Sequence, residues 1–344
     1  MTALGHESSL AAAPTPERMA GIASSARAWL VSLLERIPAR GDVAVRALCH
    51  VLIASWIADT INGRDRAKSA GFTEVAQHVA RSLNASENSS YIDGVKPTLK
   101  LLVEILLSSE GLGVEPFRQF LTQSVSILRR ADPALEADPS LMDKRILLYS
   151  ANILPRPPTV SADGVRVLLD NFRLSASTEV IDALTLQLEC LTGWGTRLVD
   201  AEIIAPSLGE IFAGFAVQRL RNYDLISAAR LIRLQEYLAA SRIIARRDDL
   251  YNALCMQHRS HGPFGWYGPE AAKLRKVSPV LLEDTEFYLV TTLECLWTLA
   301  ERSIDGWRLF GRVPRYVSLQ VEQHPCAESQ PTSPKAYCRT KGES

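Results

Sequence analysis

The sequence predicts an all-α fold of about twelve helices that pair as antiparallel hairpins. Three observations predict it. Apolar residues recur at three- and four-residue steps along most of the 344-residue chain, as Val43, Ala47, Leu48 and Val51 do. Alternating apolar and polar residues, the pattern of a half-buried strand, are scarce. The connections between periodic segments are short, which favours neighbouring helices that run antiparallel.

Six periodic segments precede residue 155, and local signals mark where several of them begin or end. Pro16 precedes the first, at a helix start where the missing N–H of proline costs little. Gly63 follows the second, Gly111 and Gly113 follow the fourth, and Pro155 follows the sixth. The predicted helices are 17–37, 41–62, 71–84, 94–109, 114–131 and 139–153.

Six further segments follow. Ser177, Thr178 and Glu179 precede an apolar run, which ends at the GWG of residues 193–195. Asp224 opens another helix, because aspartate is a favoured N-cap residue. The predicted helices are 160–174, 178–193, 205–221, 224–239, 242–259 and 281–303.

The predicted helical domain spans residues 16–312. Residues 1–15 are small and polar, and residues 313–344 contain four prolines, so both ends are expected to be disordered. The linker PRPPTVSADG at 155–164 leaves two arrangements open. It either separates two halves, 16–154 and 160–312, or lies at the midpoint of one ring-like array.

Composition and charge limit the possible partners and the compartment. Basic and acidic residues balance at 38 each, so neither nucleic acid nor an anionic membrane is an expected partner. The six cysteines form no CxxC pair, which favours buried free thiols in a reducing compartment. The sequence has no signal or transit peptide and no uninterrupted apolar run of eighteen residues. We therefore expect a cytoplasmic protein without a membrane span.

The segment LCMQHRSHGPFGWYGPE, at residues 254–270, interrupts this helical pattern and allows four interpretations. The spacing Cys255-x-x-His258-x-x-His261 could hold zinc. Cys255 beside His258 could form a nucleophilic thiolate. Phe264, Trp266 and Tyr267 could stack on nucleic-acid bases, although the neutral charge of the chain argues against this. The segment could also be a structural connector between helices.

We favour the structural connector. Gly262 permits a tight turn, Pro263 fixes φ, and Phe264 can pack under the helix ends. The side-chain amide of Gln257 both donates and accepts, so it could satisfy main-chain groups at two helix termini.

The same residues resemble a known family. Gln257, Gly262, Phe264, Gly265 and Trp266 are similar to the glutamine–glycine–aromatic connector of α/α-toroid proteins, the terpenoid cyclase and prenyltransferase class. TEFYLVTTLECLWTLAE, at 285–301, is similar to the inner helix that follows such a connector. The resemblance implies an α/α toroid with a pocket at one end of the barrel. It brings no catalytic residue, because the DDxxD and DxDD signatures are absent. The candidate pocket residues are Gln257, His258, His261, Trp266, Tyr267, Glu286 and Tyr288.

Charged residues elsewhere suggest weaker alternatives. Glu74 and His78 share a helix face and, with Glu104, could begin a di-iron site, but a solvated pair explains their four-residue spacing better. Arg230 and Arg233 could bind a carboxylate or phosphate, although an exposed charged stripe is the usual meaning of this spacing. Glu294 would point into a cavity if the last helix lines a barrel.

Two functions remain open. The first is a binding or scaffold protein whose concave helical surface holds a peptide, a carrier domain or another protein, in a bacterial biosynthetic pathway. The second is an enzyme of bacterial secondary metabolism with its active site at one end of the barrel. We place binding first, because nucleotide-binding and hydrolase motifs are absent and no cofactor is indicated. Convergence of three or more histidines and carboxylates in one pocket would favour the enzyme.

Overall fold

The computed structural model describes most of the chain and is all-helical there, which confirms the predicted all-α class. Among the described residues, the only β pairing is an isolated antiparallel bridge between His258 and Phe264. The described residues are 13–63, 70–130, 139–155, 180, 183–185, 188–189, 192–195, 208–238, 246–265, 281–304 and 307–312.

The N-terminal helices begin at signals visible in the sequence. The Oγ1 of Thr15 accepts the N–H of Arg18 at 3.2 Å, and Pro16 is the first residue of α1. α4 begins at Pro97, later than the predicted residue 94, because the short turn η2 precedes it. The bounds are α1 Pro16–Leu34, α2 Asp42–Ile61, α3 Ala70–Leu83, η1 Ser86–Asn88, η2 Ile92–Gly94, α4 Pro97–Ser109, α5 Glu115–Arg130 and α6 Pro139–Ser150.

The C-terminal helices follow the prediction except at α11, which is shorter than the predicted 242–259. Arg246 at its start has a left-handed backbone, with φ 54°, and the chain turns after Met256. The predicted helix 160–174 lies outside the described residues, and 178–193 is described at a few helical positions. The bounds are α9 Leu208–Arg221, α10 Leu225–Leu238, α11 Arg247–Cys255, α13 Leu281–Ser303 and η4 Phe310–Arg312.

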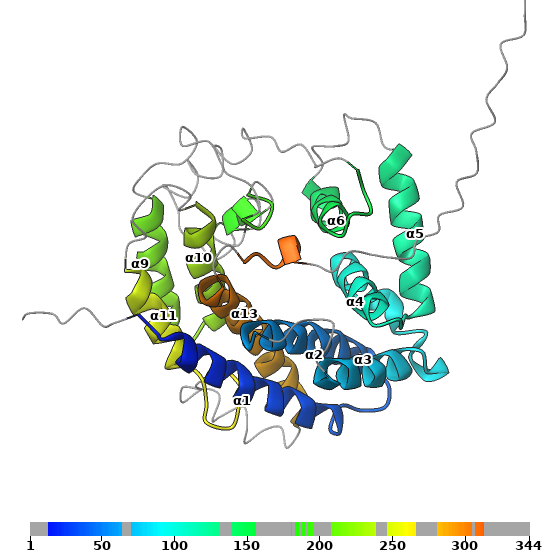
Figure 1. The fold of residues 1–344 in the computed structure, drawn as a ribbon, viewed down its shortest axis with the longest axis horizontal. Helices are drawn as coiled ribbons and strands as arrows, with labels where there is room; N and C mark the ends of the chain where they lie inside the picture. Colours follow the sequence, from blue (N-terminus) through cyan, green and yellow to red (C-terminus); the bar gives the residue numbers. More distant parts are fainter. Residues whose placement is uncertain are drawn as a thin grey trace, which may run out of the picture.

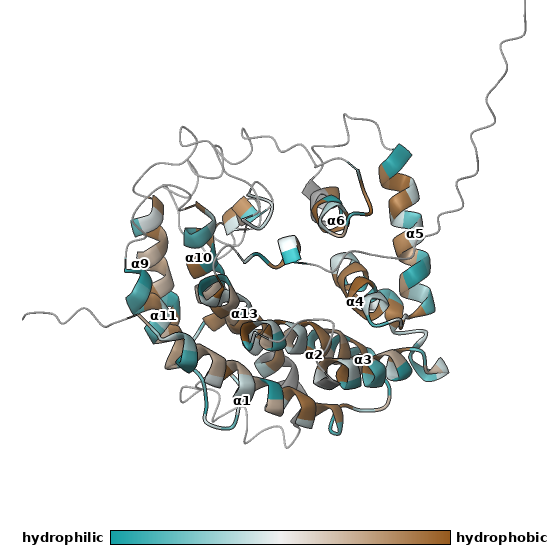
Figure 2. Ribbon diagram, in the orientation of Figure 1, coloured by the Kyte–Doolittle hydropathy of each residue, from teal (hydrophilic) through white to brown (hydrophobic). Residues whose placement is uncertain are grey.

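Helix α2 forms the centre of the core. It packs against α1, α3, α4 and α13, and 15 of its 20 residues are buried. Figure 2 shows apolar residues along most of this helix. α2 is the one helix in the described part of the chain that is long and apolar enough to cross a membrane, but 83% of its most apolar window is buried inside the fold. Burial of this kind is typical of a core helix.

The helices form a series of packed neighbours that connects the two parts of the chain. α6 packs against α4, α4 against α2, α2 against α13, and α13 against α10. α1, α3, α5 and α9 pack against members of this series. In Figure 1, α9, α10 and α11 lie on one side of the view, and α4, α5 and α6 lie on the other. The α2–α13 contact therefore joins residues from the two ends of the described chain.

The residues after α13 return to the middle of the molecule. η4 contacts α6 and lies between α6 and α10 in Figure 1. Trp307 is 1% exposed, and the ring of Phe310 lies 4.3 Å from Trp194 and 6.0 Å from Trp297, between ring centroids. The last described segment is thus part of the core and not a surface extension.

Candidate functional site

The described part of the predicted connector, residues 257–265, is a closed turn held by its own backbone. The carbonyl of Gln257 accepts the N–H of Gly265 at 2.9 Å, and the carbonyl of Pro263 accepts the N–H of Arg259 at 2.9 Å. The side-chain Oε1 of Gln257 is buried and has no hydrogen-bond partner among the residues that the structure describes. The prediction that the amide side chain of Gln257 satisfies helix termini is therefore wrong, because the main chain makes the bond.

This turn is fastened to α1 and α13. The ring of Phe264 is fully buried, and its N–H donates to the Oγ1 of Thr292 on α13 at 3.0 Å. Arg259 donates to the hydroxyl of Tyr288 at 2.7 Å. Gly262, at φ +117°, lies against Trp29 on α1 so closely that a Cβ atom would be 2.4 Å from the Cβ of Trp29. Through these contacts, the turn after α11 packs against both α1 and α13.

Neither the metal nor the nucleophile interpretation of this segment is supported. Cys255 is buried, His258 is half-buried and His261 is exposed, and the described residues contain no group of three ligands that could hold a metal ion. Burial raises the pKa of the Cys255 thiol, so the thiolate that a nucleophile needs is disfavoured. Burial also lowers the pKa of His258.

The remaining sequence candidates are dispersed. Trp266 and Tyr267 lie outside the described residues, and so does the side chain of Glu286. Tyr288 is buried against Arg259 and does not face a described cavity.

Glu104 does not join Glu74 and His78 in a di-iron site. It is fully buried, and it accepts the Val114 N–H at 2.9 Å and the Arg118 Nε at 3.2 Å. Glu74 is exposed on α3. Glu104 therefore stabilises the turn between α4 and α5.

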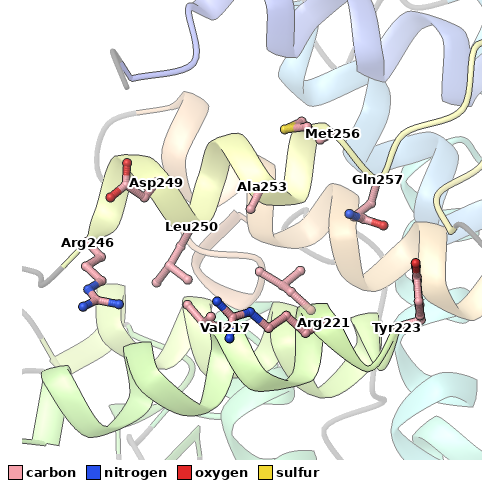
Figure 3. A pocket seen from close by; sticks show the side chains of 10 residues that line it. Val217, Arg221, Tyr223, Arg246, Asp249, Leu250, Ala253, Met256 and Gln257 are labelled. Carbon is pink, nitrogen blue, oxygen red and sulfur yellow. The ribbon is translucent and has the colours of Figure 1, made fainter. Parts of the chain in front are cut away.

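A groove between α9 and α11 is the candidate functional site (Figure 3). Its volume is about 580 Å³, within the range of ligand-binding pockets. Gln257, one of the predicted pocket residues, lies at one end. The lining residues are Val217, Leu220, Arg221, Tyr223, Arg246, Asp249, Leu250, Ala253, Met256 and Gln257.

The groove has an apolar floor and a charged rim. Val217 on α9 faces Leu250 and Ala253 on α11, and Leu220 on α9 also lines the groove. Met256 is 68% exposed, which is unusual for an apolar side chain.

The rim of the groove carries two arginines. Arg221 and Arg246 form no ion pair with any residue that the structure describes. Asp249, three residues further along α11, supplies one negative charge to the lining. The groove thus combines exposed apolar surface with a small excess of positive charge.

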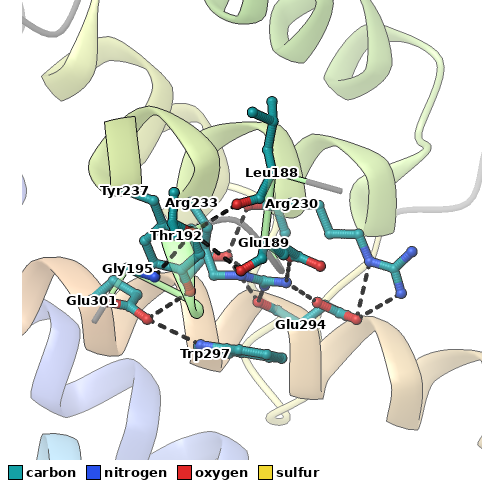
Figure 4. Close-up of polar contacts among 12 residues, drawn as sticks. Leu188, Glu189, Thr192, Gly195, Arg230, Arg233, Tyr237, Glu294, Trp297 and Glu301 are labelled. Atoms are coloured by element: carbon teal, nitrogen blue, oxygen red, sulfur yellow. Dashed lines mark hydrogen bonds and ion pairs between the residues drawn. The ribbon is translucent and has the colours of Figure 1, made fainter. Parts of the chain in front are cut away.

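A second polar cluster lies in the core between α10 and α13 (Figure 4). Arg233 is 1% exposed, and its guanidinium donates to Glu294 at 2.6 Å and to Glu189 at 3.4 Å. It also stacks 4.0 Å above the ring of Trp297. Arg230 donates to the other oxygen of Glu294 at 3.0 Å. Beside these two cations, the pKa of Glu294 is lowered although burial acts to raise it.

Glu301 continues this cluster two helical turns beyond Glu294 on α13. Its Oε1 accepts the hydroxyl of Tyr237 at 2.9 Å and the indole N–H of Trp297 at 3.1 Å. Its Oε2 accepts Nη1 of Arg308 at 2.8 Å, and Arg308 also donates to the carbonyl of Gly195. Burial raises the pKa of Glu301 to about 7.

Sequence reasoning misplaced Arg233 on an exposed stripe and missed Glu189, Tyr237, Glu301 and Arg308. A signal for part of the cluster was present. Polar residues on α13 recur at 294, 298 and 301, and polar residues on α10 recur at 230, 233 and 237. These steps of three and four place each set on one helix face, and the charges of the two sets are opposite.

The groove between α9 and α11 can bind a partner, and the polar cluster between α10 and α13 can stabilise the fold. The carboxylates of the cluster are buried, and each is paired with an arginine. Comparisons with protein-family models, curated proteins and solved structures found no match.

Proposed function

We propose that this chain is a helical binding protein whose groove between α9 and α11 holds a segment of a peptide, a carrier domain or another protein. A cytoplasmic role in a bacterial biosynthetic pathway is the context that the composition favours. The observation that carries the proposal is the groove itself. It has an apolar floor, an exposed methionine and two arginines with no ion pair among the described residues.

We also propose that the helices form an α/α toroid. The packed series α6, α4, α2, α13 and α10 supports inner helices that follow one another around a ring. α1, α3, α5 and α9 each pack on a neighbouring member of this series, as outer helices would. The groove between α9 and α11 would then lie on the outer layer of the ring.

An enzyme remains the second candidate. The observation that favours it is the convergence of Glu189, Glu294 and Glu301 on one region of the core. Arginines neutralise them, however, and the described histidines lie on separate elements: His50 on α2, His78 on α3, and His258 and His261 in the connector. Binding therefore accounts better for the arrangement.

Selection from a random-peptide display library on the purified protein tests the proposal. We expect enriched peptides whose affinity, measured by fluorescence anisotropy, falls at least about tenfold in Met256→Glu, because a charge then lies on the apolar groove. Ile127→Glu is the matched control, since Ile127 is 61% exposed on the distant helix α5. If no enriched peptide distinguishes the two variants, the groove is not the binding site.

A further inference from the structure

We propose that the occupant of the α9–α11 groove is an amphipathic helix of another protein that carries carboxylates beside its apolar stripe. This inference rests on the proposed function and specifies its partner. Three properties of the groove carry it: the structures that build its walls, its length and its charge.

The walls favour a helix over an extended peptide. Both are α-helices, whose backbone N–H and C=O groups are paired within the helix. A peptide that binds as an added strand needs a free sheet edge, and no strand exists among the described residues. A helix satisfies its own backbone, so it can lie on α9 and α11 and contribute side chains alone.

The length of the groove matches a short helix. Along α11 the lining residues run from Arg246 to Met256, which at 1.5 Å per residue corresponds to roughly 15 Å, or nearly three turns. A partner helix with apolar residues at positions i, i+4 and i+7 presents a stripe of about 10 Å, or two turns, which fits within this length. Met256 is the adaptable contact along this line, because its unbranched side chain adjusts to different apolar shapes.

The positive charge of the groove favours a partner helix with acidic residues beside its apolar stripe. Arg221 lies on the α9 wall and Arg246 at the start of α11, and both side chains are exposed without an ion pair inside the described structure. Asp249 offsets one of these two charges. A guanidinium binds a carboxylate through two parallel hydrogen bonds, so a glutamate or aspartate on the partner would meet Arg221 in a favourable geometry.

Two designed helical peptides of about fourteen residues, or four turns, test this inference. Both carry leucine at i, i+4 and i+7 and a side-chain staple, and they differ in having glutamate or lysine at the flanking positions. We expect the acidic peptide to bind the full-length protein about tenfold more tightly than the basic one in fluorescence anisotropy. Arg221→Glu should weaken the acidic peptide and strengthen the basic one, whereas Arg130→Glu, at an exposed site on α5, should change neither.

The outcomes separate the two proposals. If both peptides bind, lose affinity in Met256→Glu and ignore Arg221→Glu, the acidic-helix inference is wrong and the binding groove stands. If library peptides of other conformations bind the groove but neither helix does, the inference is also wrong. If nothing binds in a groove-dependent way, both proposals fail. A dimer in sedimentation analysis that Met256→Glu dissociates would instead identify a second copy of this chain as the occupant.

Discussion

Arg233 is a buried cation, and the free-energy cost of its burial is offset by the anions around it. Its side chain is 1% exposed and contacts Glu294, Glu189, Thr298 and the ring of Trp297. Removing a charge from water costs several kcal/mol, and well-placed partners offset that cost. The arginine and its carboxylates therefore stabilise the fold as a set and not as independent residues.

We predict that Arg233→Ala destabilises the protein by about 3–5 kcal/mol, because it leaves Glu294 and Glu189 buried without their main cation. Urea unfolding followed by circular dichroism measures this change. Arg130→Ala, at an exposed position on α5, is the control and should change the free energy of unfolding by less than about 0.5 kcal/mol. Equal effects of the two substitutions would contradict the buried network.

Glu301 makes the stability of the protein depend on pH in a definite direction. Burial raises its pKa from the ordinary value of 4.5 to about 7. Between these values the carboxyl of the unfolded chain is ionised while that of the folded chain keeps its proton. The contribution of Glu301 to stability is therefore greatest below about pH 4.5, falls as the pH rises to about 7, and does not change further above that pH.

We predict that Glu301→Gln removes this part of the pH dependence. The free-energy difference between the variant and the wild type should shift in favour of the variant by about 3 kcal/mol from pH 4.5 to pH 8. Urea unfolding at both pH values measures it. Glu74→Gln, on the exposed face of α3, controls for the loss of a carboxyl. A pH profile that is the same in Glu301→Gln and the wild type would show that Glu301 does not titrate as described.

For single residues, the sequence predicted turn positions better than it predicted which charged side chains are buried. The candidates around Gln257 were found because glycine and proline residues, with aromatic residues among them, interrupt the helical periodicity there. Arg233 was misread because its spacing from Arg230 is equally compatible with an exposed and a buried face. Its burial depends on Glu294, which lies 61 residues later in the chain, and no local pattern specifies that contact.

The connector is the element whose local geometry matters most for the packing of its neighbours. At Gly262 the backbone has φ +117°, and a Cβ atom would lie 2.4 Å from the Cβ of Trp29 and 2.7 Å from the carbonyl oxygen of Ser25. The glycine is therefore required both by the turn and by the close approach of α1.

We predict that Gly262→Ala destabilises the protein more than Gly41→Ala does. Gly41 has a similar φ of +121°, but a Cβ atom there has no neighbour within 4 Å. Both variants carry the backbone strain, roughly 1–3 kcal/mol, and only Gly262→Ala adds the collision with α1. The difference between their melting temperatures isolates the collision, and a difference near zero would mean that α1 does not pack on the connector.

Element boundaries were predictable where a residue type enforces them. Proline starts α1 and α4, and α2 ends just before Gly63, because these residues act through their own backbone. The start of α11 was not predictable. Arg246 has a left-handed backbone conformation, which arginine rarely adopts, and no glycine or asparagine at this position indicates it in the sequence.

On the scale of the whole molecule, the contact between α2 and α13 joins the two halves of the predicted helical domain. The all-α class followed from periodicity. The order in which the helices pack did not, because a helix face shows that it is buried and not which partner covers it. The groove between α9 and α11 was likewise not predictable from the sequence, because it arises from the spacing of two helices and not from a motif.

We predict that the two halves unfold together. Ile57 on α2 is fully buried, and Ile57→Ala should cost about 2–5 kcal/mol. Native-state hydrogen exchange should show a similar loss of protection in α4 and in α10, on both sides of the α2–α13 contact. Loss confined to α4 would indicate two independently stable halves, 16–154 and 160–312.

The pairing of α2 with α13 also affects how the chain can fold during its synthesis. About 220 residues separate the end of α2 at Ile61 from the start of α13 at Leu281. At roughly 5–20 residues per second, α2 leaves the ribosome on the order of 10–45 s before the helix that covers it. During that interval α1, α3 and α4 can already pack on α2, but the apolar face that α13 covers stays open, so aggregation of the nascent protein is a risk until α13 is made.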